Sequence, residues 1–290
     1  MVEHEPGRDG AELTPISPAV RNRFAELARA PEDKFELDRG SLLIAAEAYP
    51  DLDTDYYLRM LDRLADSLRP ELAGVVSGRE QIECLRGFLF ERCCFAGNQS
   101  DYKDPRNSFL NEVLERRTGL PITLSIVYIE VARRVGLPVR GVNFPAHFMA
   151  KYVGDEEILI DPFFGRIVTK SECLDRLRRA LGRGARLRRD PLECAHNHEV
   201  LVRVLGNLKN AYIQSRDFVR ALGACDRILL LTPDAPQELR DRGLVYQQLE
   251  CFGSSQSDLE RFLELAPDHE TCDRVRDVLI SVKRNADRVC

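Results

Sequence analysis

The C-terminal third of the chain contains an internal repeat, which restricts the possible folds more than any other feature. Two segments, "YIQSRDFVRALGACDRILLLTPD" and "YQQLECFGSSQSDLERFLELAPD", align at an offset of 34 residues. The matched residues are a large aromatic, a small residue, an arginine, a leucine and a Pro-Asp pair: Tyr212 with Tyr246, Ala221 with Ser255, Arg227 with Arg261, Leu231 with Leu265, and Pro233-Asp234 with Pro267-Asp268. A small residue lets antiparallel helices approach, and a proline ends a helix. The pattern therefore predicts repeated helical hairpins.

A helix–turn–helix unit that repeats every 34 residues is typical of tetratricopeptide repeats. We therefore predict an all-α domain over residues 191–290. Such a domain can bind a peptide or a partner protein on its surface. Alternatively, it can cap and stabilise the domain that precedes it. The repeat pattern alone leaves both roles open.

Composition and charge limit the class of protein. The chain has 290 residues, of which 44% are hydrophobic and 31% charged, as in a soluble globular protein with two domains or with one large domain and an appendage. A net charge of −5 argues against nucleic-acid binding, which needs a concentrated basic face. No apolar run approaches the roughly 20 residues of a membrane span, and the N-terminus lacks the apolar core of a secretory signal. We expect a disordered tail over 1–18, a cytoplasmic location, reduced thiols, and neither a metal nor another cofactor.

Residues 19–190 are predicted to form an α+β domain, because helical spacing of apolar residues gives way to alternation after Pro138. Residues 19–69 are expected to be helical, with one helix that starts at Ser41, breaks at Pro50 and restarts after Asp53 or Thr54. Three helices follow: one from Arg79 to about Cys94, a short one capped by Ser108 and ended by Gly119, and a central one from Pro121 to Arg134 or Val135. Two strands, 139–153 and 157–163, are then joined by a turn around Gly154 and Asp155.

A histidine and an aspartate on the two predicted strands form a candidate site. A three-residue turn would place Asp161 opposite Met149, and His147 would then be its diagonal neighbour on the same face of the sheet. A turn of two or four residues would put His147 and Asp161 on opposite faces. A His–Asp pair can supply a general base and its orienting carboxylate to a nucleophile. Alternatively, His147 is a half-buried histidine and Asp161 caps the turn in "DPFFG".

The stretch "FAGNQSDYKDPRNSFLNEVLERRTGLPITLSIVYIEVARRVGLPVRGVNFPAHFMAKY", followed by "ILIDPFFG", resembles bacterial SirB-type proteins. These proteins carry a transglutaminase-like domain followed by tetratricopeptide repeats, and a related segment occurs in some eukaryotic F-box proteins. The resemblance implies a papain-like core, with a cysteine at the start of the central helix and a His–Asp pair on the sheet. His147 and Asp161 match that pair. Proline, at Pro121, occupies the expected cysteine position, and no cysteine lies between Cys94 and Cys173.

Ser125 is the candidate replacement for the missing thiol. On a helical wheel it shares a face with Pro121, but it lies one turn deeper than a nucleophile should. Thr123 lies on another face, which it shares with Glu130 and Arg134. Alternatively, Ser125 is small only to let the helix pack closely on the sheet.

Two functions follow from these residues. The first is an intracellular, non-catalytic transglutaminase-like protein that binds a protein or peptide through its repeats and through the cleft around Ser125, His147 and Asp161. The alternative is a hydrolase or acyltransferase in which Ser125 is the nucleophile, His147 the base and Asp161 its orienter. The missing cysteine favours the first function.

Three further groups of residues have both a structural and a functional interpretation. Cys93 and Cys94 are expected in the core rather than in the cleft. His196 and His198, with Cys194, are expected to cap the next helix rather than to bind a metal. The arginines between 176 and 189 are expected on a solvated helix face and linker rather than on a surface that binds an acidic partner or nucleic acid.

Overall fold

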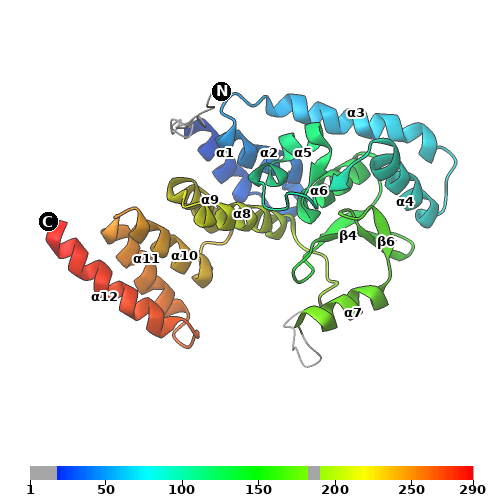
Figure 1. The fold of residues 1–290 in the computed structure, drawn as a ribbon. Coiled ribbons are helices and arrows are strands. Elements are labelled where there is room, and N and C mark those ends of the chain that lie inside the picture. The colour runs from blue at the N-terminus through cyan, green and yellow to red at the C-terminus, as the bar shows by residue number, and fades with distance from the viewer. Residues whose placement is uncertain (1–17, 182–189, 290) are drawn as a thin grey trace, which may run out of the picture.

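The computed structural model describes residues 18–181 and 190–289 (Figure 1). The expected tail therefore lies outside the described residues, except for Pro18, which begins the first helix. The first four helices are α1 (Pro18–Ala28), α2 (Leu37–Ala48), α3 (Thr54–Leu72) and α4 (Gly78–Arg86), with a 3₁₀ turn, η1 (Glu32–Lys34), between α1 and α2. The break at Pro50 is confirmed, and Asp53 caps α3 by accepting a hydrogen bond from the Tyr56 N–H at 3.0 Å.

Two predicted details of these helices are wrong. Helix α2 begins at Leu37 rather than at Ser41, and the Ser41 hydroxyl instead donates to the Leu37 carbonyl inside the helix, at 2.8 Å. The helix predicted to reach Cys94 changes after Arg86 into a π-helical segment, η2 (Gly87–Arg92). The chain then turns at Cys94, whose φ is 59°, and this leaves Cys94 exposed rather than in the core.

The middle of the chain contains a 3₁₀ turn, η3 (Pro105–Ser108), helix α5 (Leu110–Arg116) and the central helix α6 (Pro121–Arg134). Two short strands, β1 (Ala96–Gly97) and β2 (Thr118–Gly119), pair in parallel beside them. The predicted caps of α5 are wrong: Phe109 rather than Ser108 is the N-cap residue, and Arg117 ends the helix at φ 55°. Gly119 instead belongs to β2.

Helix α6 has the predicted limits and lies at the centre of the domain. It begins at Pro121, and the chain leaves it through Gly136 at φ 82°. Every residue from Pro121 to Ala132 is buried, because α6 packs against α2, α3, α5 and two strands of the sheet. A helix covered on all sides needs apolar residues around its whole circumference, and "PITLSIVYIEVA" has nearly that composition.

Four antiparallel strands form the main sheet, in the order β3 (Val139–Val142), β4 (Met149–Val153), β5 (Glu157–Asp161) and β6 (Arg166–Val168). The strand predicted over 139–153 is therefore two strands joined by a loop, and β6 was not predicted. The register of β4 and β5 is as predicted. Val153 pairs with Glu157 across a three-residue turn, and continuing the ladder past Ala150 and Ile160 brings Met149 opposite Asp161.

Helix α7 (Lys170–Leu181) follows the sheet, and residues 182–189 of the predicted linker lie outside the described part of the chain. The predicted hairpins are confirmed: α8 (Asn197–Gln214) with α9 (Phe218–Leu231), and α10 (Pro236–Gln248) with α11 (Phe252–Leu265). A further helix, α12 (Cys272–Val289), packs on α11. Figure 1 shows α10–α12 extending away from the sheet.

The first hairpin shares a hydrophobic core with the domain that precedes it. Leu201, Leu205 and Ile228 belong to the same buried cluster as Leu42 and Ile44 of α2. Most of the apolar residues of α10–α12 belong to a separate cluster. The α+β domain and the first helical hairpin therefore form one packed unit.

Candidate functional site

The structure brings His147 and Asp161 together. Asp161 is the fully buried last residue of β5, and its Oδ1 lies 2.9 Å from His147 Nε2. Its other oxygen, Oδ2, accepts a hydrogen bond from Arg176 of α7 at 3.2 Å. The sequence predicts His147 on a strand, and this is wrong: His147 lies in the loop before β4. A turn at Ala146, with φ 57°, allows the His147 N–H to donate to the Phe144 carbonyl at 3.0 Å.

Aromatic side chains surround His147 on one side. Its ring stacks on Phe164 at a centroid distance of 6.4 Å and meets the edge of Phe163 at 6.3 Å. Phe163 in turn contacts Tyr102 at 6.0 Å. Phe164 and Tyr102 are 49% and 51% exposed, so both present aromatic surface to solvent beside the His–Asp pair.

The third candidate residue, Ser125, makes no hydrogen bond with His147 in the described part of the chain. Ser125 is fully buried in α6, and its hydroxyl donates to the carbonyl of Pro121 at 2.7 Å. Thr123 also stabilises the start of the helix. Its hydroxyl donates to the Asn107 carbonyl at 2.7 Å and accepts from the Leu120 N–H at 3.0 Å. The geometry therefore assigns both hydroxyls to helix packing and capping.

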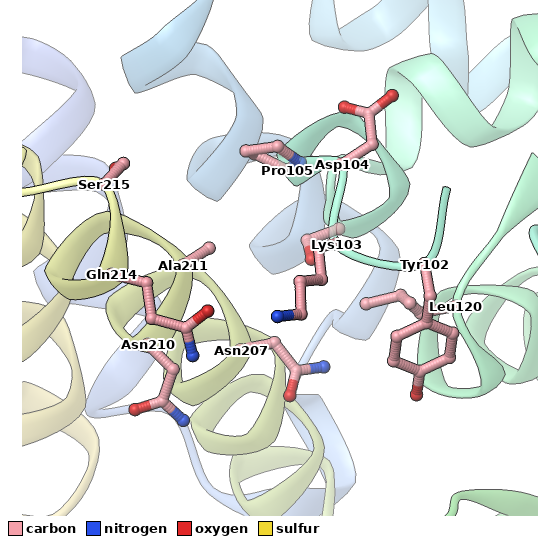
Figure 2. A pocket seen from close by; sticks show the side chains of 11 residues that line it. Tyr102, Lys103, Asp104, Pro105, Leu120, Asn207, Asn210, Ala211, Gln214 and Ser215 are labelled. Atoms are coloured by element: carbon pink, nitrogen blue, oxygen red, sulfur yellow. The ribbon is translucent and has the colours of Figure 1, made fainter. Parts of the chain in front are cut away.

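A groove that was not predicted from the sequence lies between loop 98–108 and helix α8. It has a volume of about 520 Å³, and we call it the α8 groove (Figure 2). Asn207, Asn210, Ala211, Gln214 and Ser215 line one side, and Tyr102, Lys103, Asp104, Pro105, Ser108 and Leu120 line the other. Figure 2 shows the Lys103 side chain reaching from the loop toward Asn207.

Two buried asparagines hold the loop side of the groove in shape. The Asn98 side chain accepts from the Asp101 N–H at 2.9 Å and donates to Asn107 at 3.1 Å. Asn107 also donates to the Asp101 carbonyl at 2.7 Å. The segment "GNQSDYKDPRNS" is rich in the turn-forming residues that are typical of a loop. Asn98 and Asn107 could have suggested an ordered one, because such side chains satisfy backbone groups in turns.

The other candidate residues have structural roles. His196 is the N-cap residue of α8, and its N–H donates to Glu199 at 2.9 Å, so the capping prediction is confirmed for His196. His198 lies 3.2 Å from Glu32 and packs on Phe35. Among residues 18–181 and 190–289, no group of three or more His, Cys, Asp or Glu side chains could hold a metal ion.

The arginines of α7 have partners within the domain. Arg176 bonds to Asp161, Arg178 bonds to Asp175 at 2.9 Å, and Arg179 donates to the Asp175 carbonyl at 3.2 Å. The remaining arginines of the predicted linker lie outside the described residues. No helix in the described part of the chain has the length and apolar character needed to cross a membrane.

The central helix, the sheet with its His–Asp pair and the following hairpins define a transglutaminase-like domain joined to tetratricopeptide repeats. A family model for the transglutaminase-like superfamily matches residues 55–206, and a tetratricopeptide repeat model matches residues 208–279. The chain belongs to the transglutaminase-like superfamily and, within it, to the family of UPF0162 and SirB1 proteins.

Three relatives illustrate this membership. A UPF0162 protein of Xylella fastidiosa (strain 9a5c) is 39% identical over 261 residues, which cover 88% of this chain and 93% of the relative. UPF0162 protein PA3419 of Pseudomonas aeruginosa is 33% identical over 83% of this chain and 88% of its own length. Protein SirB1 of Salmonella typhimurium is 28% identical over 82% of this chain and 89% of its own length. No solved structure matches the chain significantly.

Proposed function

We propose that this protein is a non-catalytic binding protein that holds an extended segment of a partner protein in the α8 groove. The observation that carries the proposal is the groove itself, which has polar side chains from both the transglutaminase-like part and the first repeat helix. Tetratricopeptide repeats commonly bind peptides. We place this activity in the cytoplasm, because the eight cysteines of the described residues are all free thiols.

The side chains of α8 suit an extended peptide backbone. Asn207, Asn210 and Gln214 are spaced three and four residues apart, and thus lie on one face of the helix. Each carboxamide offers both a donor and an acceptor, as does each backbone amide of an extended chain. Seven helical residues span about 10 Å, close to the length of three extended residues.

The aromatic residues connect the groove to the His–Asp pair. Tyr102 lines the groove and contacts Phe163, and Phe163 contacts His147. A peptide that leaves the groove at Tyr102 is therefore directed toward His147, beside which the Phe164 ring is also exposed. In this proposal His147 and Asp161 shape the end of the binding surface. Catalysis is not proposed, because Pro121 replaces the thiol and the Ser125 hydroxyl is already bonded to the Pro121 carbonyl.

A pull-down with matched variants tests the proposal. The variant Asn210→Ala/Gln214→Ala removes two exposed carboxamides from the groove. Its control, Gln237→Ala/Gln248→Ala, removes two exposed carboxamides from α10. We expect the wild type and the control to retain the same partner and the groove variant to lose it. Equal retention by all three proteins would contradict binding in the groove.

The His147–Asp161 hydrogen bond, at 2.9 Å, favours one second function, hydrolysis or acyl transfer with Ser125 as the nucleophile. A fluorophosphonate probe tests it, because such probes modify activated serines. Labelling that disappears in both Ser125→Ala and His147→Ala would establish the enzyme. Unlabelled wild-type protein, or labelling unchanged in Ser125→Ala, would leave the binding function.

A further inference from the structure

A second pocket, which shares no lining residue with the α8 groove, lies among the N-terminal helices. It has a volume of about 480 Å³ and is formed by the end of α2, the link to α3, the first turn of α3 and one face of α5. Its charged lining residues are all acidic: Asp51, Asp53, Glu112 and Glu115. We call it the acidic pocket. The arrangement of charges favours a cationic ligand.

Asn111, one of the residues that line this pocket, has an unused hydrogen-bond acceptor. It lines the pocket and is only 3% exposed, yet its Oδ1 atom is buried without a hydrogen-bond partner among the described residues. A buried acceptor without a donor is costly, and native proteins rarely leave one without a functional reason. A ligand with N–H groups would supply the missing donor after a small adjustment of the side chain.

Two tyrosines organise the carboxylates of α5. The Tyr57 hydroxyl donates to Glu115. Burial, and then the hydrogen bond to Glu112, raises the pKa of Tyr49 above its usual range. Burial and the bond to Glu115 do the same for the pKa of Tyr57. Both phenols therefore remain neutral donors, and they orient the two carboxylates without neutralising their charge.

The cations already present do not saturate the pocket. Arg59 lies 3.5 Å from Asp53, and Arg116 lies 3.9 Å from Glu112 while also facing Asp104 at 3.6 Å. Asp51 and Glu115 form no ion pair within the described part of the chain. The carboxylates are also not grouped closely enough to hold one metal ion. Dispersed charges of this kind match a cation whose N–H groups are themselves spread over several atoms.

We propose that the acidic pocket binds an organic cation with several N–H donors, either the guanidinium or ammonium group of a basic side chain or a free polyamine. One donor satisfies Asn111, and the charge is neutralised by Glu115 and Asp51. Tyr56, which lines the pocket and is 43% exposed, contributes aromatic surface for the cation. This binding goes beyond the peptide recognition proposed above.

The test uses two probes, spermidine and a fluorescein-labelled tri-arginine peptide, at fixed ionic strength. Asn111→Leu replaces the carboxamide with a branched apolar group of similar shape, and Glu112→Gln/Glu115→Gln removes two charges while keeping both acceptors. Glu264→Gln, on the exposed face of α11, is the control. We expect saturable binding to the wild type, about tenfold weaker binding to Asn111→Leu and to the double variant, and unchanged binding to the control.

The two probes distinguish the sources of the cation. Binding of the peptide alone would assign the pocket to a basic side chain of a partner, and binding of spermidine alone would assign it to a polyamine. The thermal midpoint of Asn111→Leu is expected to equal or exceed that of the wild type, so lost binding cannot be ascribed to unfolding. Equal binding by Asn111→Leu and the wild type would overturn the proposal. The groove variant Asn210→Ala/Gln214→Ala is expected to bind both probes normally, so the two proposals fail independently.

Discussion

Glu130 is a buried carboxylate of α6 whose charge state depends on pH near neutrality. It accepts hydrogen bonds from Arg133 and Arg134 at 2.7 Å each, and it lies near Asp38, which shares both arginines. Burial, and then repulsion from Asp38, raises the pKa of Glu130 to about 7. Burial also opposes ionisation of Asp38, but Arg134, the Arg39 N–H and Arg133 together outweigh it and lower the pKa of that carboxyl. As pH rises, the contribution of Glu130 to the free energy of unfolding therefore falls, whereas that of Asp38 increases.

We predict that Glu130→Gln flattens the pH dependence of stability between pH 5 and 8. The folded state holds the Glu130 proton more tightly than the unfolded state, so the wild type loses stability as pH rises from the ordinary carboxyl pKa to about 7. The loss relative to Glu130→Gln is about 3 kcal/mol over this range. Urea denaturation of both proteins at several pH values measures it. Parallel curves would contradict the raised pKa.

At the level of single residues, only part of this cluster could be predicted. The pairing of Glu130 with Arg134 follows from their spacing on one helix, and the structure has it at 2.7 Å. Asp38 could not be assigned to the same cluster, because nothing in its local sequence shows that α2 packs beside the end of α6. The same limit applies to Arg176, whose contact with Asp161 depends on where α7 crosses the sheet.

At the level of elements, sequence reasoning succeeded where local signals were strong. Pro121 and Gly136 mark both ends of α6, and the turn at Gly154 fixes the register of β4 and β5. It failed over 143–148, because that loop keeps the apolar alternation of a strand and contains no glycine. Its turn depends on Ala146 in a left-handed conformation, which alanine seldom adopts. The same apolar pattern thus serves a strand and a loop that packs Phe144 and Phe148 in the interior.

Alanine substitution at two glycines should change the stability of the protein in opposite directions. At Gly97 of β1, an added Cβ would lie 2.4 Å from the Phe163 ring, so Gly97→Ala should cost about 1–3 kcal/mol and disturb the packing of Phe163 on His147. At Gly206 of α8, an added Cβ meets nothing within 4 Å, so Gly206→Ala should stabilise the protein by about 1 kcal/mol. Thermal and urea unfolding measure both changes. A Gly97→Ala protein as stable as the wild type would show that Phe163 can move freely.

At the level of the whole molecule, the first helical hairpin is part of the transglutaminase-like core. Gly40 of α2 allows a close approach to α8, where an added Cβ would lie 2.5 Å from Leu201. Arg227 of α9 is buried and contacts Glu47 of α2. Burial, and then the charge of Arg21, lowers the pKa of Arg227 to about 9. The two roles considered for the repeats, binding a partner and stabilising the preceding domain, are thus compatible. Helix α8 has one face in the core and another in the α8 groove.

Truncation at two positions separates the contribution of the first hairpin to stability from that of α10–α12. We predict that residues 1–234, which end after α9, still unfold cooperatively with a lower thermal midpoint, since α10–α12 bury most of their apolar residues in a separate cluster. Lys209 loses its partners Glu238 and Asp241 in this variant, but it also becomes accessible to water, so no unpaired charge remains buried.

Residues 1–195 should lose cooperative unfolding and aggregate, because the apolar faces of α2 and α6 lose Leu201 and Leu205. Circular dichroism and size-exclusion chromatography distinguish the two proteins. A shorter protein that unfolds at the same midpoint as residues 1–234 would mean that the first hairpin contributes nothing to the stability of the core.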